Sequence, residues 1–314
     1  MDQSLLDTMR VVALPTKTNF RGLSVREVAL FQGEHGWGEF SPFLEYGYAE
    51  SAPWLMCAIE AATKPRPKLY RTSVQVNGTI PALNNPADIE RIVESFPGVQ
   101  TFKVKVGDNL PEDLARLAKV QSLRPKAKLR IDVNGNWSAA EAITNLRAIF
   151  ENIGPLEYVE QPCGTVEELR ELKEKLRIDL KIAGDEVLRK AADPFAVDLN
   201  GAIDVLMLKV QPLGGVARAH KLAEHHKLPV VVSSALESAV GINYGLQLAA
   251  SFPEMNFDCG LGTGSLLGSN IADLPIVNGE IEISAVEPDF AGLEVAPDRF
   301  EWWKNRVMKT AELL

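Results

Sequence analysis

The chain has 314 residues, of which 46% are hydrophobic and 24% are charged. This composition is ordinary for a soluble globular protein and excludes a predominantly disordered, collagen-like or fibrous chain. The formal net charge is −9, with 33 Lys and Arg against 42 Asp and Glu, so no overall basic surface is present for nucleic acid or anionic lipid. We therefore expect a small-molecule partner, with no nucleic acid and no membrane.

The first 70 residues predict an α+β module. Apolar and polar residues alternate over residues 24–32, a turn-rich stretch follows, and residues 49–63 have a helical pattern. Pro65 and Pro67 then indicate a linker. The last segment, residues 281–314, contains a short alternating run and a helix that begins near Asp298, and it could pack on the N-terminal module.

The cysteines and the N-terminus favour a reducing, cytoplasmic location. Cys57, Cys163 and Cys259 are odd in number and form no CxxC pair. The first seven residues contain two acids where a secretory signal carries basic residues, and no apolar run approaches the ~18 residues needed to span a bilayer.

Residues 71–280 show short β-rich runs separated by amphipathic helical stretches, which is typical of a parallel sheet. We place eight strands at residues 73–77, 101–106, 128–133, 157–160, 181–184, 205–209, 229–233 and 256–260. Their near-uniform spacing predicts a closed (β/α)₈ barrel, although an open sheet shares much of this alternation. Neither a GxGxxG turn after the first strand nor a GxxxxGK[ST] motif occurs, which argues against dinucleotide and triphosphate sites.

Lysines end two of the predicted strands. In a barrel the reacting groups lie where the strands end. Lys103 and Lys105 are two residues apart on one strand, so both side chains leave the same face. Lys209 ends a strand on the opposite side of the barrel, so Lys105 and Lys209 would approach a bound molecule from opposite faces. For an isolated pair such as Lys103 and Lys105, the alternative is an exposed edge with two solvated side chains.

Carboxylates end three successive predicted strands, at Asp132, Glu160 and Asp185. Three acids brought together at a barrel mouth repel one another unless a cation lies between them. Ligands that are all oxygen select a hard divalent ion, so we expect Mg²⁺, with Mn²⁺ as a substitute. The alternative is that each acid caps a helix or pairs with an Arg or Lys on the rim.

This set of residues suits removal of a proton next to a substrate carboxylate. A desolvated lysine beside a second cation is a competent base, and Mg²⁺ with lysines counters the negative charge that develops. The four histidines form no HExxH motif, and Ser233 and Ser234 lack a GxSxG elbow. We interpret these serines as hydrogen-bond donors to substrate, with an ordinary polar turn as the alternative.

The strand-end residues resemble the enolase superfamily and, within it, the muconate-lactonizing-enzyme subgroup. The matching motifs are Lys103-Val-Lys105, Asp132-Val-Asn134, Val159-Glu160-Gln161-Pro162, Gly184-Asp185-Glu186 and Lys209. The resemblance implies that Asp132, Glu160 and Asp185 are metal ligands, that Lys105 is the base with Lys103 as its electrostatic modulator, and that Lys209 acts on the other face. It also implies a capping domain from residues 1–70 and 281–314 over a catalytic barrel of residues 71–280.

Within the subgroup, the compact o-succinylbenzoate synthases are the most similar. The motifs are Asn19-Phe20-Arg21-Gly22, Val25-Arg26-Glu27, Gly36-Trp37-Gly38-Glu39-Phe40-Ser41-Pro42-Phe43, Ser233-Ser234-Ala235-Leu236-Glu237-Ser238 and Leu261-Gly262-Thr263-Gly264. This similarity implies a syn elimination of water from 2-succinyl-6-hydroxy-2,4-cyclohexadiene-1-carboxylate, a step of menaquinone biosynthesis. The expected substrate contacts are Asn134, Ser233, Ser234, Gly262 and Arg21, where Arg21 either meets the succinyl carboxylate or lies on the rim without a ligand.

Two rival functions stay open from the sequence. The same two lysines would permit an N-succinylamino acid racemase or a dipeptide epimerase, in which Lys105 and Lys209 are opposed bases. A barrel that only binds a ligand would have to retain a costly charged cluster without chemistry. The oligomeric state, monomer or homo-oligomer, does not follow from the sequence.

Overall fold

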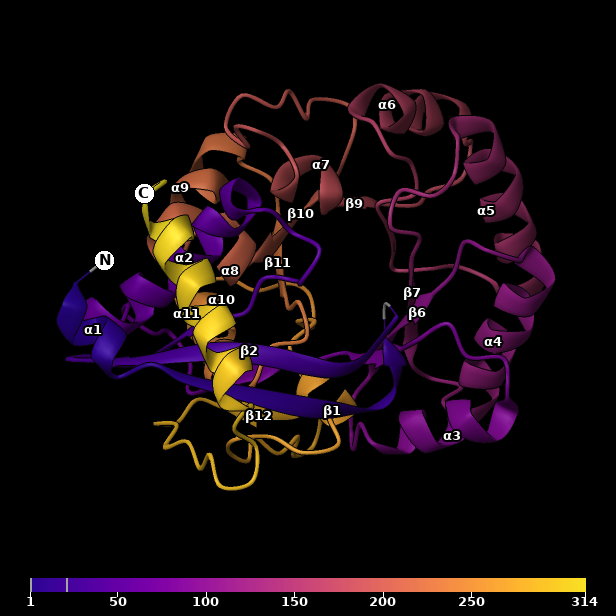
Figure 1. The fold of residues 1–314 in the computed structure, drawn as a ribbon. Coiled ribbons are helices and arrows are strands. Elements are labelled where there is room, and N and C mark those ends of the chain that lie inside the picture. The colour runs from indigo at the N-terminus through magenta and orange to yellow at the C-terminus, as the bar shows by residue number, and fades with distance from the viewer. Residues whose placement is uncertain (1, 21) are drawn as a thin grey trace.

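A barrel of parallel strands forms the centre of the molecule (Figure 1). The computed structural model describes residues 2–20 and 22–314. Seven strands pair in chain order, namely β5 (Gly78–Ile80), β6 (Thr101–Lys105), β7 (Lys128–Asp132), β8 (Tyr158–Glu160), β9 (Ile182–Gly184), β10 (Val205–Lys209) and β11 (Val230–Ser233). The expected α/β barrel is confirmed.

The barrel closes through the segment predicted as the eighth strand. Two isolated parallel bridges, Ser233 with Gly260 and Val76 with Cys259, join this segment to its neighbours on either side. The amide of Gly260 donates to the carbonyl of Val232 over 2.8 Å, and the amide of Cys259 donates to the carbonyl of Gln75 over 2.8 Å. The last unit is therefore irregular, and the short 3₁₀ helix η1 (Gly262–Leu266) follows it.

The predicted first barrel strand, residues 73–77, is only partly confirmed, because its first three residues pair outside the barrel while Val76 pairs with the eighth segment. Residues 73–75 form β4 (Ser73–Gln75), which pairs antiparallel with β12 (Glu280–Glu282), and the barrel strand β5 begins only at Gly78. A Cβ on Gly78 would lie 2.5 Å from the Phe102 ring, so this position of the strand requires glycine.

Helices surround the barrel and are started by local capping. The longer ones are α3 (Pro86–Glu94), α4 (Leu110–Leu123), α5 (Ala139–Ile153), α6 (Val166–Lys175), α9 (Val216–His226) and α10 (Ala239–Ala250). Ser138 and Thr165 form capping boxes that begin α5 and α6. The four-residue helices α7 (Glu186–Arg189) and α8 (Val210–Leu213) directly follow β9 and β10, so they lie at the mouth of the barrel.

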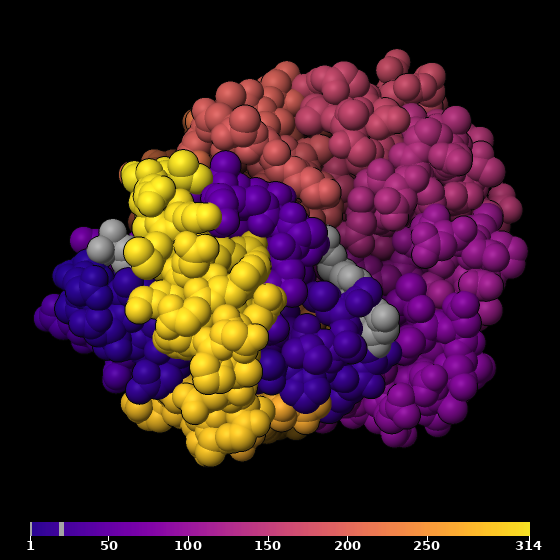
Figure 2. Space-filling model, viewed as in Figure 1, coloured from indigo at the N-terminus to yellow at the C-terminus, as the bar shows by residue number. Residues whose placement is uncertain are grey.

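A second layer covers the barrel mouth. It contains α1 (Gln3–Asp7), the antiparallel strands β1 (Arg10–Phe20), β2 (Leu23–Gly33) and β3 (Gly36–Phe40), and the helices α2 (Tyr48–Thr63) and α11 (Pro297–Ala311). These elements share an apolar cluster of their own, which includes Trp54 and Trp303. Figure 2 shows α11 in yellow lying across the indigo N-terminal segment.

The C-terminal segment thus returns to the N-terminal module. The exact division at residues 70 and 281 stays a prediction, and β12 spans one of these boundaries. No helix in the described part of the chain combines the length and apolar content needed to cross a bilayer.

Candidate active site

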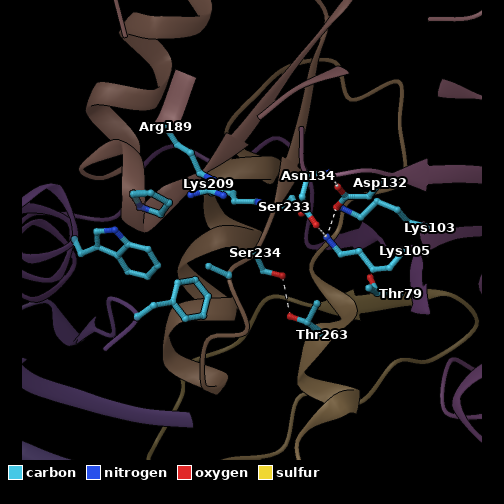
Figure 3. A pocket seen from close by; sticks show the side chains of 14 residues that line it. Thr79, Lys103, Lys105, Asp132, Asn134, Arg189, Lys209, Ser233, Ser234 and Thr263 are labelled. Atoms are coloured by element: carbon cyan, nitrogen blue, oxygen red, sulfur yellow. Dashed lines mark hydrogen bonds and ion pairs between the residues drawn. The ribbon is translucent and has the colours of Figure 1, made fainter. Parts of the chain in front are cut away.

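A pocket at the barrel mouth lies between the strand ends and the second layer (Figure 3). It is lined by Phe43, Trp54, Thr79, Lys103, Lys105, Asp132, Asn134, Arg189, Lys209, Pro212, Ser233, Ser234, Ala235 and Thr263. Phe43 and Trp54 come from the covering layer, whereas the other residues come from the barrel. The polar lining therefore has an aromatic cover, which limits access of water to the charged groups.

The two expected catalytic lysines enter the pocket from opposite sides. Lys105, at the end of β6, lies 2.5 Å from Oδ2 of Asp132 and 2.8 Å from Oδ1 of Asn134. Lys209, at the end of β10, lies 2.5 Å from Oδ2 of Asp185. Figure 3 shows Lys209 beside Arg189 on one side and Lys105 beside Asp132 on the other. A molecule held between them would meet an amine on each face.

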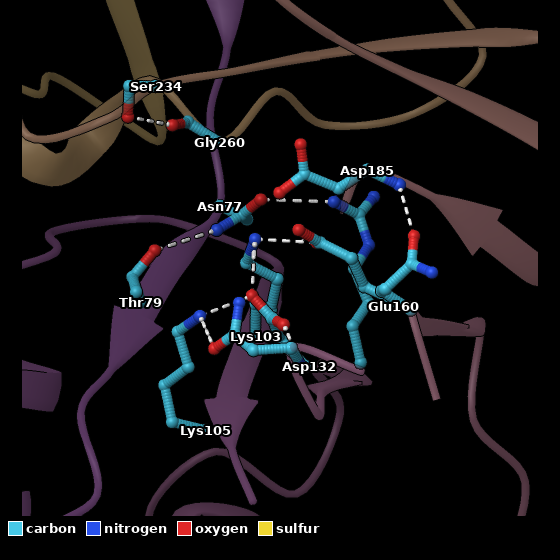
Figure 4. A network of polar contacts seen from close by, with 12 residues as sticks. Asn77, Thr79, Lys103, Lys105, Asp132, Glu160, Asp185, Ser234 and Gly260 are labelled. Carbon is cyan, nitrogen blue, oxygen red and sulfur yellow. Dashed lines mark hydrogen bonds and ion pairs between the residues drawn. The ribbon is translucent and has the colours of Figure 1, made fainter. Parts of the chain in front are cut away.

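Lys103 links two of the three carboxylates (Figure 4). Its Nζ lies 2.6 Å from Oε2 of Glu160 and 3.3 Å from Oδ2 of Asp132, and its side chain is only 6% exposed. Burial alone would lower the pKa of Lys103, but Glu160 and Asp132 raise it overall above its ordinary value. These two contacts favour the charged form of Lys103.

The three carboxylates are fully buried and differ in protonation behaviour. Burial would raise the pKa of Asp132, but Lys105 and Lys103 hold it well below its usual range. Burial would raise the pKa of Asp185, but Lys209 and Arg189 lower it to about 2. Burial, with Asp132 beside it, raises the pKa of Glu160 to about 7. The three carboxylates thus share their pairing with three lysines and Arg189, and burial favours the neutral form of Glu160.

The donor set fits a hard cation by its chemistry. Oε1 of Glu160 is buried without a hydrogen-bond partner, and so is Oε2 of Glu186 behind it. In the described ranges, however, no three His, Cys, Asp or Glu side chains are grouped in a geometry that could hold an ion. Lys103, Lys105 and Lys209 pair with oxygens of Glu160, Asp132 and Asp185. A cation and these lysines would compete for them.

The expected substrate contacts are only partly brought together. Asn134, Ser233 and Ser234 line the pocket, and Oγ of Ser234 lies 2.8 Å from Oγ1 of Thr263. Gly262 does not line it, because its backbone is packed against Asn77 and lies beside a separate cavity. Arg21 lies outside the described residues.

Several lining residues were missed by the sequence analysis. Arg189 lies four residues after Asp185, and α7 turns its guanidinium back to Asp185 and to Oε1 of Glu186 at 2.7 Å. Thr79 and Thr263 flank glycines and look like turn residues in the sequence. Phe43 is part of a motif that supported the resemblance, but the sequence alone does not show that it covers the pocket. The others missed are Trp54, Pro212 and Ala235.

Comparison with known proteins gives two family matches and full-length relatives. Residues 88–299 match the model described as enolase C-terminal domain-like, and residues 11–62 match enolase N-terminal domain-like. The o-succinylbenzoate synthase of Mycobacterium ulcerans is 47% identical over 99% of this chain and 95% of its own length. That of Mycobacterium bovis is 45% identical over 99% of this chain and 96% of its own length.

Solved structures agree on the fold. A dipeptide epimerase from Enterococcus faecalis, complexed with Mg and L-Leu-L-Tyr, has a TM-score of 0.72 at 19% identity, covering 89% of this chain and 97% of its own. An N-succinyl Arg/Lys racemase from Bacillus cereus has a TM-score of 0.73 at 20% identity, covering 94% and 96%. At such low identity these similarities establish architecture and not substrate.

Proposed function

The chain belongs to the o-succinylbenzoate synthase family of the enolase superfamily, and from this we propose that it removes water from 2-succinyl-6-hydroxy-2,4-cyclohexadiene-1-carboxylate to give 2-succinylbenzoate, a step of menaquinone biosynthesis. It is an enzyme of the hydro-lyase type. The single observation that supports the chemistry is the pair of lysines on opposite sides of a pocket lined by Asp132, with Glu160 and Asp185 buried and paired with Lys103 and Lys209. We propose a cytoplasmic location, with the carboxylate substrate as its partner.

Mg²⁺ is the cofactor of this proposal, and Mn²⁺ is a substitute. Asp132, Glu160 and Asp185 would hold it, since they end adjacent strands and Glu160 keeps an unpartnered buried oxygen. The ion would supply positive charge to the carboxylate of the substrate as negative charge develops there. Glu186 and Arg189 would lie behind this set and keep Asp185 in place.

Lys105 is proposed to act first as base and then as acid. It would remove the ring proton next to the substrate carboxylate, and the resulting ammonium would protonate the departing hydroxyl on the same face. Removal and return of the proton on one face gives a syn elimination. Asn134, which lies 2.8 Å from the Lys105 ammonium, would orient it.

Lys209 and Lys103 contribute positive charge in this scheme. Lys209 would lie across the ring from Lys105 and favour the transition state electrostatically, without exchanging a proton. Lys103 would stay protonated next to Glu160 and Asp132. Ser233 and Ser234 would donate hydrogen bonds to the substrate at the pocket wall.

Direct turnover tests this function. Purified protein with Mg²⁺ is given the cyclohexadiene acid, and 2-succinylbenzoate is quantified by chromatography. Lys105→Ala should abolish its formation, while Lys128→Ala, at the start of β7 and 62% exposed, should leave it unchanged. Absence of the product with the wild-type protein, or normal turnover by Lys105→Ala, would overturn the assignment.

A second candidate is a 1,1-proton transfer on an N-succinylamino acid or a dipeptide. The opposed placement of Lys105 and Lys209 supports it, because one base on each face is what such a reaction needs (Figure 3). Incubation with N-succinylphenylalanine in D₂O measures it. Deuterium incorporation and racemisation without elimination of the cyclohexadiene acid would favour this candidate over the dehydration.

A further inference from the structure

Glu39 on β3 is a buried carboxylate outside the pocket that contacts three pocket-lining segments. It is 3% exposed and accepts hydrogen bonds from the barrel and from its own layer. From the barrel, the amide of Gly241 donates to it over 2.9 Å and the hydroxyl of Ser238 donates to the same oxygen. The side-chain amide of Gln211 donates to its other oxygen over 3.2 Å.

Each donor belongs to a segment that lines the pocket elsewhere. Ser238 ends the loop that follows Ser233 and contains Ser234 and Ala235, and it caps the start of α10. Gln211 lies in α8, next to Pro212 and two residues after Lys209.

The third segment is the continuation of β3 in the covering layer. The hydroxyl of Ser41 donates to Glu39 over 2.6 Å, and Phe43 of the pocket cover follows two residues later. The amide of Ser41 also donates to Oε1 of Gln211 over 3.2 Å, which ties this segment to α8. Glu39 therefore joins the cover, the Lys209 side and the serine wall at one buried point.

The contacts also make Glu39 an N-terminal cap supplied from another layer. The backbone amides at the start of a helix have no partners within the helix, and a carboxylate satisfies them well. Glu39 accepts from the Ser238 amide at 3.3 Å and from the Gly241 amide, in the first turn of α10. A shift of this carboxylate would leave buried amides unpaired, so the loop before α10 is held firmly against the cover.

We propose that Glu39 is a positioning residue, which fixes the wall formed by residues 233–238 and the turn after Lys209 relative to the aromatic cover. It does not touch the substrate. The kinetic part of this inference rests on the proposed dehydration, whereas the structural part does not.

The chain offers a matched control in Glu60 on α2. Glu60 accepts from the Val216 amide at 2.6 Å and from the Tyr244 hydroxyl at 2.7 Å, so it also caps a barrel helix, α9, from the covering layer. Neither of these donors lines the pocket. Glu39→Gln and Glu60→Gln therefore make the same substitution at the same kind of helix cap. The first lies beside segments that line the pocket, and the second lies away from them.

Hydrogen exchange measures the positioning directly, whatever the substrate. In Glu39→Gln we expect the Ser238 and Gly241 amides to exchange at least tenfold faster than in the wild type, with the Val216 amide unchanged. Glu60→Gln should give the reverse pattern. Unchanged exchange at both amides in Glu39→Gln would overturn the proposal.

Kinetics then separate positioning from simple structural support. Glu39→Gln should lower kcat for the dehydration at least tenfold well below its unfolding temperature, while Glu60→Gln stays within twofold. Ser238→Ala leaves Glu39 in place, and the double variant should be no slower than Glu39→Gln alone. Wild-type kcat and KM in Glu39→Gln, or additive losses in the double variant, would overturn the proposal. A wild-type protein that does not turn over the cyclohexadiene acid would instead refute the proposed function, and exchange would still test Glu39.

Discussion

The Lys209 ammonium lies 2.5 Å from Oδ2 of Asp185, four strands around the barrel from the strand that carries Lys105. Lys105 lies 2.5 Å from Oδ2 of Asp132, so each of the two lysines pairs with a carboxylate. This arrangement makes their contributions separable, because one lysine would exchange protons with the substrate and the other would supply charge.

Substitution of the two lysines by arginine should have unequal effects. Lys105→Arg removes the base, so we expect kcat to fall by about 10²–10⁴. Lys209→Arg keeps a cation beside Asp185, so dehydration should be less affected than in Lys209→Met. Steady-state kinetics of the three variants measure this. If Lys209→Arg and Lys209→Met lose activity equally, the interpretation of Lys209 as a cation fails and a proton-transfer role is favoured.

Removal of divalent ions should abolish turnover and lower thermal stability together. Exhaustive dialysis against EDTA is expected to give inactive, folded protein, and Mg²⁺ should restore activity and raise Tm, because a ligand that binds only the folded state stabilises it. Asp185→Asn, which retains the shape of the side chain, should lose most of the Mg²⁺-dependent rise in Tm. Full activity after dialysis would contradict the three carboxylates as ligands.

The sequence predicts the charged residues at the strand ends better than it predicts the other residues that line the pocket. Lys103, Lys105, Asp132 and Lys209 line one pocket because the ends of parallel strands meet at one edge, and strand residues follow from local pattern. Arg189 was missed because the four-residue helix that turns it back to Asp185 has no sequence periodicity.

Other misses have similarly local or long-range causes. Gly262, which is expected to contact substrate, is not among the residues that line the pocket, and a Cβ added to it would lie 3.0 Å from the carbonyl of Asn77. Phe43 and Trp54 depend on how the covering layer docks, which is set by contacts such as those of Glu39 that join residues far apart in the sequence.

The buried acid Glu237 should make stability depend on pH. Burial, with Glu39 nearby and only partly offset by Arg26, raises the pKa of Glu237 to about 7 from an ordinary value of 4.5. Between these two pH values the folded state therefore holds a proton that the unfolded state has released. The contribution of Glu237 to the free energy of unfolding is fully present below about pH 4.5 and is lost as the pH rises through 7. The full effect is on the order of 3 kcal/mol.

Glu237→Gln tests this contribution, because an amide does not titrate and its oxygen can still accept from the Ala235 amide, which lies 2.6 Å from Glu237. Urea unfolding at pH 4.5 and pH 8 gives the free energy of unfolding of both proteins. The loss between the two pH values should be larger in the wild type than in Glu237→Gln. An equal pH dependence in the two proteins would show that Glu237 titrates normally.

Trp303 on α11 should be the main anchor of the C-terminal segment. It is fully buried, its ring packs edge-on against Phe40 at 5.9 Å, and its indole N–H donates to Oε2 of Glu27 over 2.7 Å. Trp303→Ala is expected to lower the free energy of unfolding by about 3–5 kcal/mol. Trp302, 40% exposed and in contact with Arg299, is the matched control and should cost about 1 kcal/mol or less when changed to alanine.

Trp303→Ala should also affect substrate binding in the pocket. Arg306, one turn further along α11, donates to the carbonyls of Phe43 at 2.9 Å and Tyr46 at 2.8 Å, so the helix holds the segment that carries Phe43 over the pocket. We therefore expect Trp303→Ala to raise KM even at temperatures where the protein stays folded, while Trp302→Ala does not. A loss confined to kcat in Trp303→Ala would mean that the cover plays no part in binding.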